Sequence, residues 1–240
     1  KSCDPHIKFA ILTGVTKFSK VSVFSDLNNL EDISMDERFV EICGITEQEL
    51  RDNLDNETEL LATANKLAKE ECYAKLKAMY DGYHFEQDTV GIYNPFSILN
   101  TFKKRKFKDY WFESGTPSLL VEVMKRCNYP LDRMNDSQAT ADLLGSIDSI
   151  ERTPLPLFFQ AGYLTIKGYD EEFQTYALGF PNQEVEKAFT RFLIPYYTPW
   201  QESDSAFSVN QFVKELRTGK PEAFMKRLNA LFADTTYQIQ

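Results

Sequence analysis

The sequence predicts a mixed α/β fold that is mainly helical. Apolar residues recur at helical spacing over much of the chain, N-cap residues precede several of these stretches, and strand-like runs are few and short. The chain has 240 residues, of which 42% are apolar and 26% charged, a composition typical of folded domains. We divide it into residues 1–100, 101–200 and 201–240, each described below.

The first predicted element is a buried strand over Ile7–Thr13. This run, IKFAILT, is continuously apolar apart from one lysine and the final threonine, and Gly14 ends it. Strands buried on both faces lack the alternation of half-buried strands. Because no strand–helix–strand repeats follow, we interpret the run as one strand of a sheet whose other strands are not in this chain.

Helices are predicted from residue 35 onward. Thr46 and Glu49 have the spacing of a capping box, and apolar residues between Thr58 and Tyr80 form a single helical stripe. Residues Tyr83–Tyr93 fit a small hairpin. Asn94-Pro95 then begins another helix, with Asn as the N-cap and Pro in the first helical position.

The clearest local unit runs from Pro154 to Tyr197. A short helix ends at Gly162, two strands follow at Tyr163–Lys167 and Thr175–Leu178, and Asn182 caps a second helix. Helix, hairpin and helix in this order predict a winged-helix-like module.

The remaining segments are simpler. Thr116-Pro117 repeats the cap-and-proline signal before a helix through Met124. Ser203–Ser208 is predicted to be a linker, and Val209–Phe232 to form one or two amphipathic helices.

Composition argues against several classes of function. A net charge of −9 disfavours general binding to nucleic-acid phosphates, and no run of 18 uncharged apolar residues predicts a membrane span. The four cysteines are far apart, which favours reduced thiols and a cytoplasmic location over a disulfide framework or a metal site.

Catalytic motifs are also missing from the sequence. Gly219-Lys220 is the only Gly-Lys pair, but Pro221 follows it, so there is no phosphate-binding P-loop. No acidic residue lies two positions before any lysine, as the Glu-x-Lys core of restriction-type nucleases requires. We therefore assign no catalytic residue and no metal site to this chain, and expect that it is not an enzyme by itself.

Several long blocks resemble a bacterial family of predicted AAA-ATPase-like proteins. These blocks are, in order, FAILTGVTKFSKVSVFS, LNNLEDI, YDGYHF, YNPFS, YWFESGTP, FQAGYLTI and FPNQEV. They extend the resemblance to about residue 195.

The resemblance implies a parent protein with an N-terminal P-loop ATPase, a helical and winged-helix-like section, and a C-terminal nuclease-like domain. On this view residues 1–100 are the remnant edge of the ATPase sheet followed by a helical lid. Residues 101–200 are the winged-helix-like domain, and residues 201–240 link to the nuclease-like domain. ATP and Mg²⁺ would be cofactors of the parent, and its two missing domains would be the partners of this segment.

Three residues are candidates for contacting nucleotide in such a parent. Thr13 holds, by resemblance, the position of a polar sensor at the end of a late sheet strand, with Lys17 close behind it. Asn94 belongs to a YNP block that could contact nucleotide in a lid. Its alternative role is the helix cap described above.

A basic cluster offers a second kind of site. Lys103, Lys104, Arg105, Lys106 and Lys108 lie beside an aromatic run, a combination that can bind nucleic-acid phosphates and stack bases. The same cations also suit the C-terminus of a helix, where they oppose the helix dipole.

Three functions follow as hypotheses. The first is a non-catalytic regulatory connector that couples nucleotide state to a downstream nuclease-like domain. The alternatives are a nucleic-acid-binding winged-helix-like module, acting alone or through the parent, and a scaffold for protein–protein contacts that include homo-oligomers.

Overall fold

A computed structural model describes residues 8–14, 31–113, 118–130, 133–145, 152–197 and 202–234. Helices dominate these residues, and the strands form two small antiparallel sheets, so the mixed and mainly helical fold class is confirmed. No helix among these residues is long and apolar enough to cross a membrane.

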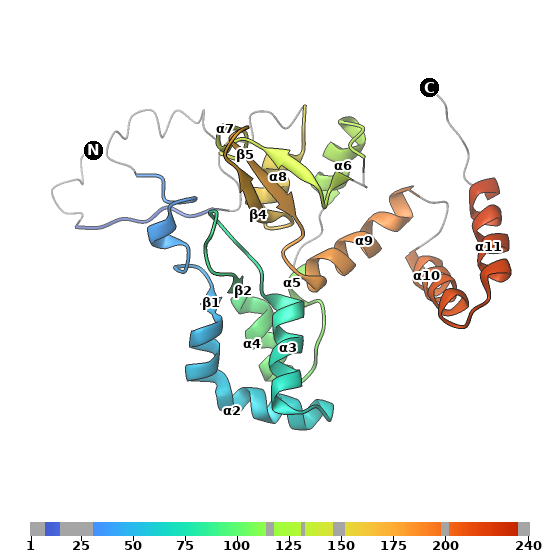
Figure 1. Cartoon of the computed structure of the whole chain (residues 1–240), viewed down its shortest axis with the longest axis horizontal. Helices are drawn as coiled ribbons and strands as arrows, with labels where there is room; N and C mark the ends of the chain where they lie inside the picture. The colour runs from blue at the N-terminus through green and yellow to red at the C-terminus, as the bar shows by residue number, and fades with distance from the viewer. Residues whose placement is uncertain are drawn as a thin grey trace.

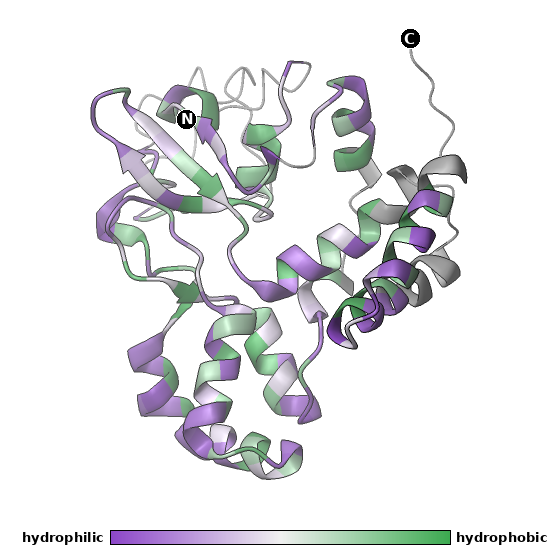
Figure 2. Cartoon of the chain, turned by 45° about the vertical axis from the view of Figure 1, so that its right-hand side comes forward, coloured by the Kyte–Doolittle hydropathy of each residue, from purple (hydrophilic) through white to green (hydrophobic). Residues whose placement is uncertain are grey.

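Three helices and a two-stranded sheet form the lower part of the molecule in Figure 1, which we call the helical unit. Its core contains Leu61, Leu76, Tyr80, Tyr93 and Ile98, all fully buried. In Figure 2 the apolar faces of its helices turn toward one another. The elements are β1 (Ile45–Thr46), α2 (Glu47–Asn65), α3 (Lys69–Tyr80), β2 (Ile92–Tyr93) and α4 (Pro95–Lys104), and the short 3-10 helix η2 (Glu37–Phe39) precedes them in the chain.

A three-stranded sheet and its covering helices form the upper part, which we call the sheet unit (Figure 1). The strand order is β3–β5–β4, with every pair antiparallel. Phe158 and Phe189 are fully buried in its core. The elements are α5 (Tyr110–Glu113), α6 (Ser118–Arg126), β3 (Ser137–Ala139), α7 (Ala141–Leu144), α8 (Leu155–Gln160), β4 (Thr165–Asp170), β5 (Thr175–Gly179) and α9 (Gln183–Tyr197).

Two further helices, α10 (Glu202–Arg217) and α11 (Pro221–Asp234), form a hairpin beside α9. Phe212 and Phe224 meet edge to face between them, with ring centroids 5.3 Å apart. The predicted amphipathic helices are confirmed here. The predicted linker Ser203–Ser208 is wrong, because these residues belong to α10.

Most local signals for helix ends are confirmed. The hydroxyl of Thr46 accepts from the N–H of Glu49, and the Glu49 carboxylate accepts from the N–H of Thr46, which completes the capping box. Asn94 caps α4, and Asn182 accepts from the N–H of Val185 in α9. The signal at Thr116-Pro117 lies outside the described residues.

The single helix predicted over Thr58–Tyr80 is wrong in one respect: the chain forms two helices. Lys66 takes a left-handed conformation with φ of 57°, and its N–H bonds to carbonyls of the last turn of α2. This cap ends α2, and α3 starts three residues later. The apolar stripe continues because both helices pack on the same core.

The strand predicted over Ile7–Thr13 is not formed in the part of it that the structure describes. Residues 8–14 have no regular secondary structure and are exposed, with Phe9 83% and Leu12 62% accessible. A buried strand requires neighbours that pair with its backbone and cover its side chains. None of the described strands pairs with this segment.

Candidate functional site

The junction between the two units is the most unusual region of the described structure. The chain crosses it at β2, where successive side chains point to opposite faces. Ile92 therefore packs in the core of the sheet unit, and Tyr93 in the core of the helical unit. A small hairpin was predicted over Tyr83–Tyr93. The chain does turn back there, but the two sides are joined by a single antiparallel bridge between Tyr83 and Ile92 and do not form a full hairpin.

Glu184 is the central residue of this junction. It lies in the first turn of α9 and is fully buried. Its carboxyl group accepts a hydrogen bond from Ser97 Oγ of α4 at 2.7 Å and another from the backbone N–H of Trp111 in α5 at 2.9 Å. One carboxyl group thus joins the helical unit, the short helix α5 and the sheet unit.

Burial raises the pKa of Glu184 to about 7, although the hydrogen bonds from Ser97 and Trp111 act in the opposite direction. A carboxyl group with this pKa changes its charge within the physiological pH range. Removing the charge removes the cost of burying it, whereas ionisation favours exposure to water. One of the contacts between the units therefore depends on the protonation of Glu184.

Two further ionisable groups, Asp81 and Lys167, lie at the same junction. Asp81 follows α3 and is 8% exposed; burial raises its pKa, and Lys77 Nζ is 3.8 Å from its carboxylate. Lys167 of β4 donates to the carbonyl of Pro181 at 3.3 Å, and burial lowers its pKa. Gly82 is packed against the same carbonyl with φ of +101°, so the backbones meet closely here.

The half-buried histidine of the junction, His84, forms hydrogen bonds within the protein. His84 donates its backbone N–H to Thr165 Oγ1 at 2.7 Å, and its Nδ1 lies 2.9 Å from the Thr89 carbonyl oxygen. No group of three or more His, Cys, Asp or Glu side chains with metal-binding geometry occurs within the described ranges.

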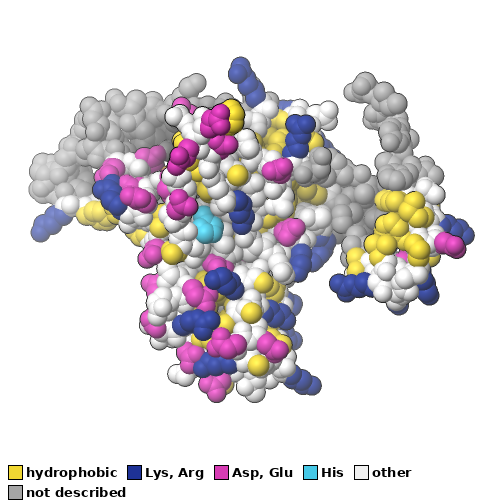
Figure 3. All heavy atoms as spheres, viewed as in Figure 1, with side chains coloured by type: hydrophobic (Ala, Val, Ile, Leu, Met, Phe, Trp, Pro, Cys, Tyr) yellow, Lys and Arg dark blue, Asp and Glu magenta, His cyan; other side chains and the backbone are white. Residues whose placement is uncertain are grey.

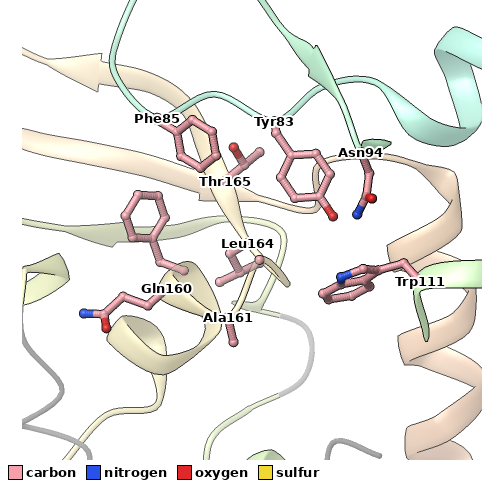
Figure 4. A pocket seen from close by; sticks show the side chains of 10 residues that line it. Tyr83, Phe85, Asn94, Trp111, Gln160, Ala161, Leu164 and Thr165 are labelled. Carbon is pink, nitrogen blue, oxygen red and sulfur yellow. The ribbon is translucent and has the colours of Figure 1, made fainter. Parts of the chain in front are cut away.

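A pocket of about 190 Å³ opens beside the junction (Figure 4). Its walls come from the loop between α3 and β2, the start of α5 and the turn from α8 to β4. The lining residues are Tyr83, Phe85, Asn94, Trp111, Phe159, Gln160, Ala161, Gly162, Leu164 and Thr165.

The structure places Thr13 and Asn94, two of the residues predicted to sense nucleotide, in different regions. Thr13 is exposed in the irregular segment 8–14, and Lys17 lies outside the described residues. Asn94 is the N-cap of α4, where its Oδ1 accepts from the N–H groups of Phe96 and Ser97 at 3.0 and 3.3 Å. The alternative role as a cap is therefore confirmed, and Asn94 also borders the pocket.

The predicted basic cluster lies at the C-terminus of α4. Lys103, Lys104, Lys106 and Lys108 are exposed, whereas Arg105 forms an ion pair of 2.6 Å with Glu57. Acidic and basic side chains are interspersed over the face shown in Figure 3.

The aromatic residues beside the cluster are buried or half-buried. Tyr110 is 3% exposed, and Lys104 Nζ lies 4.5 Å from its ring centroid. Trp111 and Phe112 pack in the sheet unit. This arrangement favours the helix-end role of the cations.

Sequence reasoning missed Glu184 as a functional residue, although one signal was available. Glu184 lies four residues before Ala188 and eight before Phe192, which places it on the apolar side of α9. A carboxyl group on a buried stripe requires partners, and here they come from residues 73 and 87 positions away in the sequence.

One known protein is similar to most of this chain. It comes from Azotobacter chroococcum mcd 1, is described as an uncharacterized protein in the vnfD 5' region, and is 39% identical over 202 residues. The alignment covers 83% of this chain but 37% of the relative, so the chain spans less than half of the relative's length. No protein-family model and no solved structure matches the chain.

Proposed function

We propose that this chain is a non-catalytic regulatory connector within a larger bacterial ATPase-like protein. It would transmit the nucleotide state of an ATPase core to a downstream nuclease-like domain. The observation that carries the proposal is the junction itself: two units with separate apolar cores meet through Glu184, a buried carboxyl group that can change its charge near neutral pH.

The junction has the properties that a two-state connector needs. Moving the units apart breaks the bond between Ser97 of the helical unit and Glu184 of the sheet unit, and exposes the carboxyl group to water. A pKa near 7 against an ordinary value of 4.5 corresponds to about 3 kcal/mol of differential interaction. Allosteric coupling energies are typically about 1–3 kcal/mol, so the energy associated with Glu184 alone is large enough to couple two sites.

The exposed segment 8–14 supports an ATPase core as the upstream partner. Phe9, Ile11 and Leu12 are 83%, 54% and 62% accessible, and apolar side chains grouped in this way favour burial against another surface. In the proposal the segment adds to the sheet of that core. Thr13 and Lys17 would then lie near the ATP and Mg²⁺ held by the core.

The order α8, β4, β5 and α9 supports a winged-helix-like relay in the sheet unit. The turn between its strands carries Asp170, Glu171 and Glu172, and the two glutamates are exposed. An acidic turn disfavours DNA as the ligand of this module. A protein surface, such as the nuclease-like domain, is the better partner in the proposal.

Calorimetric titration of the chain with Mg·ATP tests the connector role. Because the proposal leaves the phosphate-binding loop in the ATPase core, we expect no saturable heat at millimolar ATP and no ATP hydrolysis. A circular dichroism melt of the same sample establishes that the protein is folded. Tight binding that depends on Mg²⁺ would contradict the proposal.

A protein-interaction scaffold is the second candidate, favoured by the same exposed apolar side chains. It predicts that the chain associates with itself or with other proteins through Phe9 and Leu12. Sedimentation velocity over a range of concentrations should then show self-association that the double change to serine abolishes. A monomer at every concentration would exclude homo-oligomers.

A further inference from the structure

The pocket beside the junction contains a hydrogen-bond donor that the protein does not use. Tyr83 is 8% exposed, and its hydroxyl donates to no acceptor among the described residues. Native proteins pair nearly all buried polar groups, because an unpaired one loses its hydration without compensation. A hydroxyl kept in this state at the wall of a pocket indicates a site for an acceptor.

Neighbouring residues fix the direction in which the Tyr83 hydroxyl can donate. The Oδ1 of Asn94 is held by two backbone N–H groups of α4, so its amide nitrogen is turned toward the Tyr83 oxygen (Figure 4). The hydroxyl oxygen therefore faces a donor, and its own proton must point elsewhere. Thr165, on the same wall, is already bonded to the backbone of His84 through its hydroxyl.

The remaining walls determine the shape and polarity of a ligand. Phe85, Phe159 and the Trp111 ring supply aromatic surface, and Gly162 leaves room between the Trp111 and Tyr83 rings. A cavity of about 150 Å³ is known to hold benzene. The volume of about 190 Å³ therefore fits one ring with a small substituent.

Charge argues against an anionic ligand. The lining contains no Lys, Arg or His side chain. Glu184 bonds to the backbone of Trp111 in the pocket wall and acts on Tyr83 through its charge. A negative ligand would meet repulsion with no cation to offset it.

We propose that this pocket binds a neutral small molecule with a single planar ring and a hydrogen-bond acceptor, which takes the proton of the Tyr83 hydroxyl. The site goes beyond the connector role and does not depend on it. Since its walls come from α5, the α3–β2 loop and the α8–β4 turn, an occupant would also fix these three segments relative to one another.

The experiment follows the indole N–H resonance of Trp111 while the chain is titrated with benzamide, benzoate or toluene. The chain has two tryptophans, and the resonance that remains in Trp200→Phe identifies Trp111. We expect saturable shifts with benzamide at millimolar concentrations. Toluene, which has no acceptor, and benzoate, which is charged, should each bind roughly 3- to 10-fold more weakly.

Tyr83→Phe keeps the ring and removes the donor. We expect this substitution to lower the affinity for benzamide roughly 3- to 10-fold and to leave the affinity for toluene unchanged. Tyr176→Phe is the matched control, because Tyr176 is equally buried but its hydroxyl is bonded to Glu86 outside the pocket. Absence of saturable benzamide binding, or equal affinity in the wild type and Tyr83→Phe, would overturn the proposal. Neither result would change the expected outcome of the Mg·ATP titration.

Discussion

Replacing Glu184 with glutamine isolates the energetic role of the junction. Glutamine has nearly the same shape, can accept from the Trp111 N–H and can donate to Ser97 Oγ, so both contacts of the carboxyl group are preserved. The one property it removes is ionisation. Any difference between the two proteins that varies with pH therefore reports the charge of Glu184.

The direction of the effect follows from the raised pKa. The folded state holds the proton of Glu184 up to a pH of about 7, whereas the unfolded chain releases it near 4.5. Between these values the folded state binds more protons, so the wild type loses stability as the pH rises through this window. The loss approaches about 3 kcal/mol above pH 7, at about 1.4 kcal/mol per pKa unit. Glu184→Gln lacks this loss.

Urea unfolding of both proteins at several pH values from 4.5 to 8 tests this reasoning. We expect equal stabilities at pH 4.5 and a variant that is more stable by about 3 kcal/mol at pH 8. Glu186→Gln is the control, because Glu186 lies in the same helical turn but is exposed. Parallel stability curves for wild type and Glu184→Gln would refute the assignment of a raised pKa.

Three further substitutions test other parts of the structure by urea unfolding. Asn94→Ala removes the N-cap of α4 and should cost about 1 kcal/mol, whereas Asn94→Asp should retain most of the stability; equal losses would argue against capping. Gly82→Ala should cost more than about 2 kcal/mol, because its Cβ would meet the Pro181 carbonyl oxygen at 2.3 Å; a neutral result would contradict this close packing. Phe9→Ser should change stability by less than about 0.5 kcal/mol, since Phe9 is 83% exposed, and a larger loss would show that the segment is packed.

Local chemistry explains which parts of the fold could be predicted from the sequence. The capping box at Thr46 and Glu49, the cap at Asn94 and the cap at Asn182 involve atoms within three residues of each other. Such interactions form wherever the local sequence permits them, so their signals are reliable. The helix, hairpin and helix between Pro154 and Tyr197 were predictable for the same reason.

Elements that depend on distant partners could not be predicted in this way. The apolar run at Ile7–Thr13 has the composition of a strand, but strand formation requires neighbouring strands. The break at Lys66 has no glycine or proline to signal it, because a lysine adopts the left-handed conformation there. Ser203–Ser208 is polar enough for a linker, yet it is helical within α10.

The candidate site was the least predictable part. Ser97 and Glu184 are 87 positions apart in the sequence, and their contact appears only when the two units are placed together. Of the predicted site residues that the structure describes, Asn94 alone borders the junction pocket, and it was also correctly interpreted as a cap.

Hydrogen exchange at the Trp111 backbone amide tests the central claim, that the two units are joined at a junction able to open separately. This N–H donates to Glu184, the same carboxyl group that Ser97 of the helical unit contacts, so its exchange reports whether the contacts of Glu184 open. We predict an opening free energy well below that of the core amides in either unit, and a smaller value at pH 8 than at pH 6 in the wild type but not in Glu184→Gln. Exchange of Trp111 only through global unfolding, with the same free energy as both cores, would contradict the account.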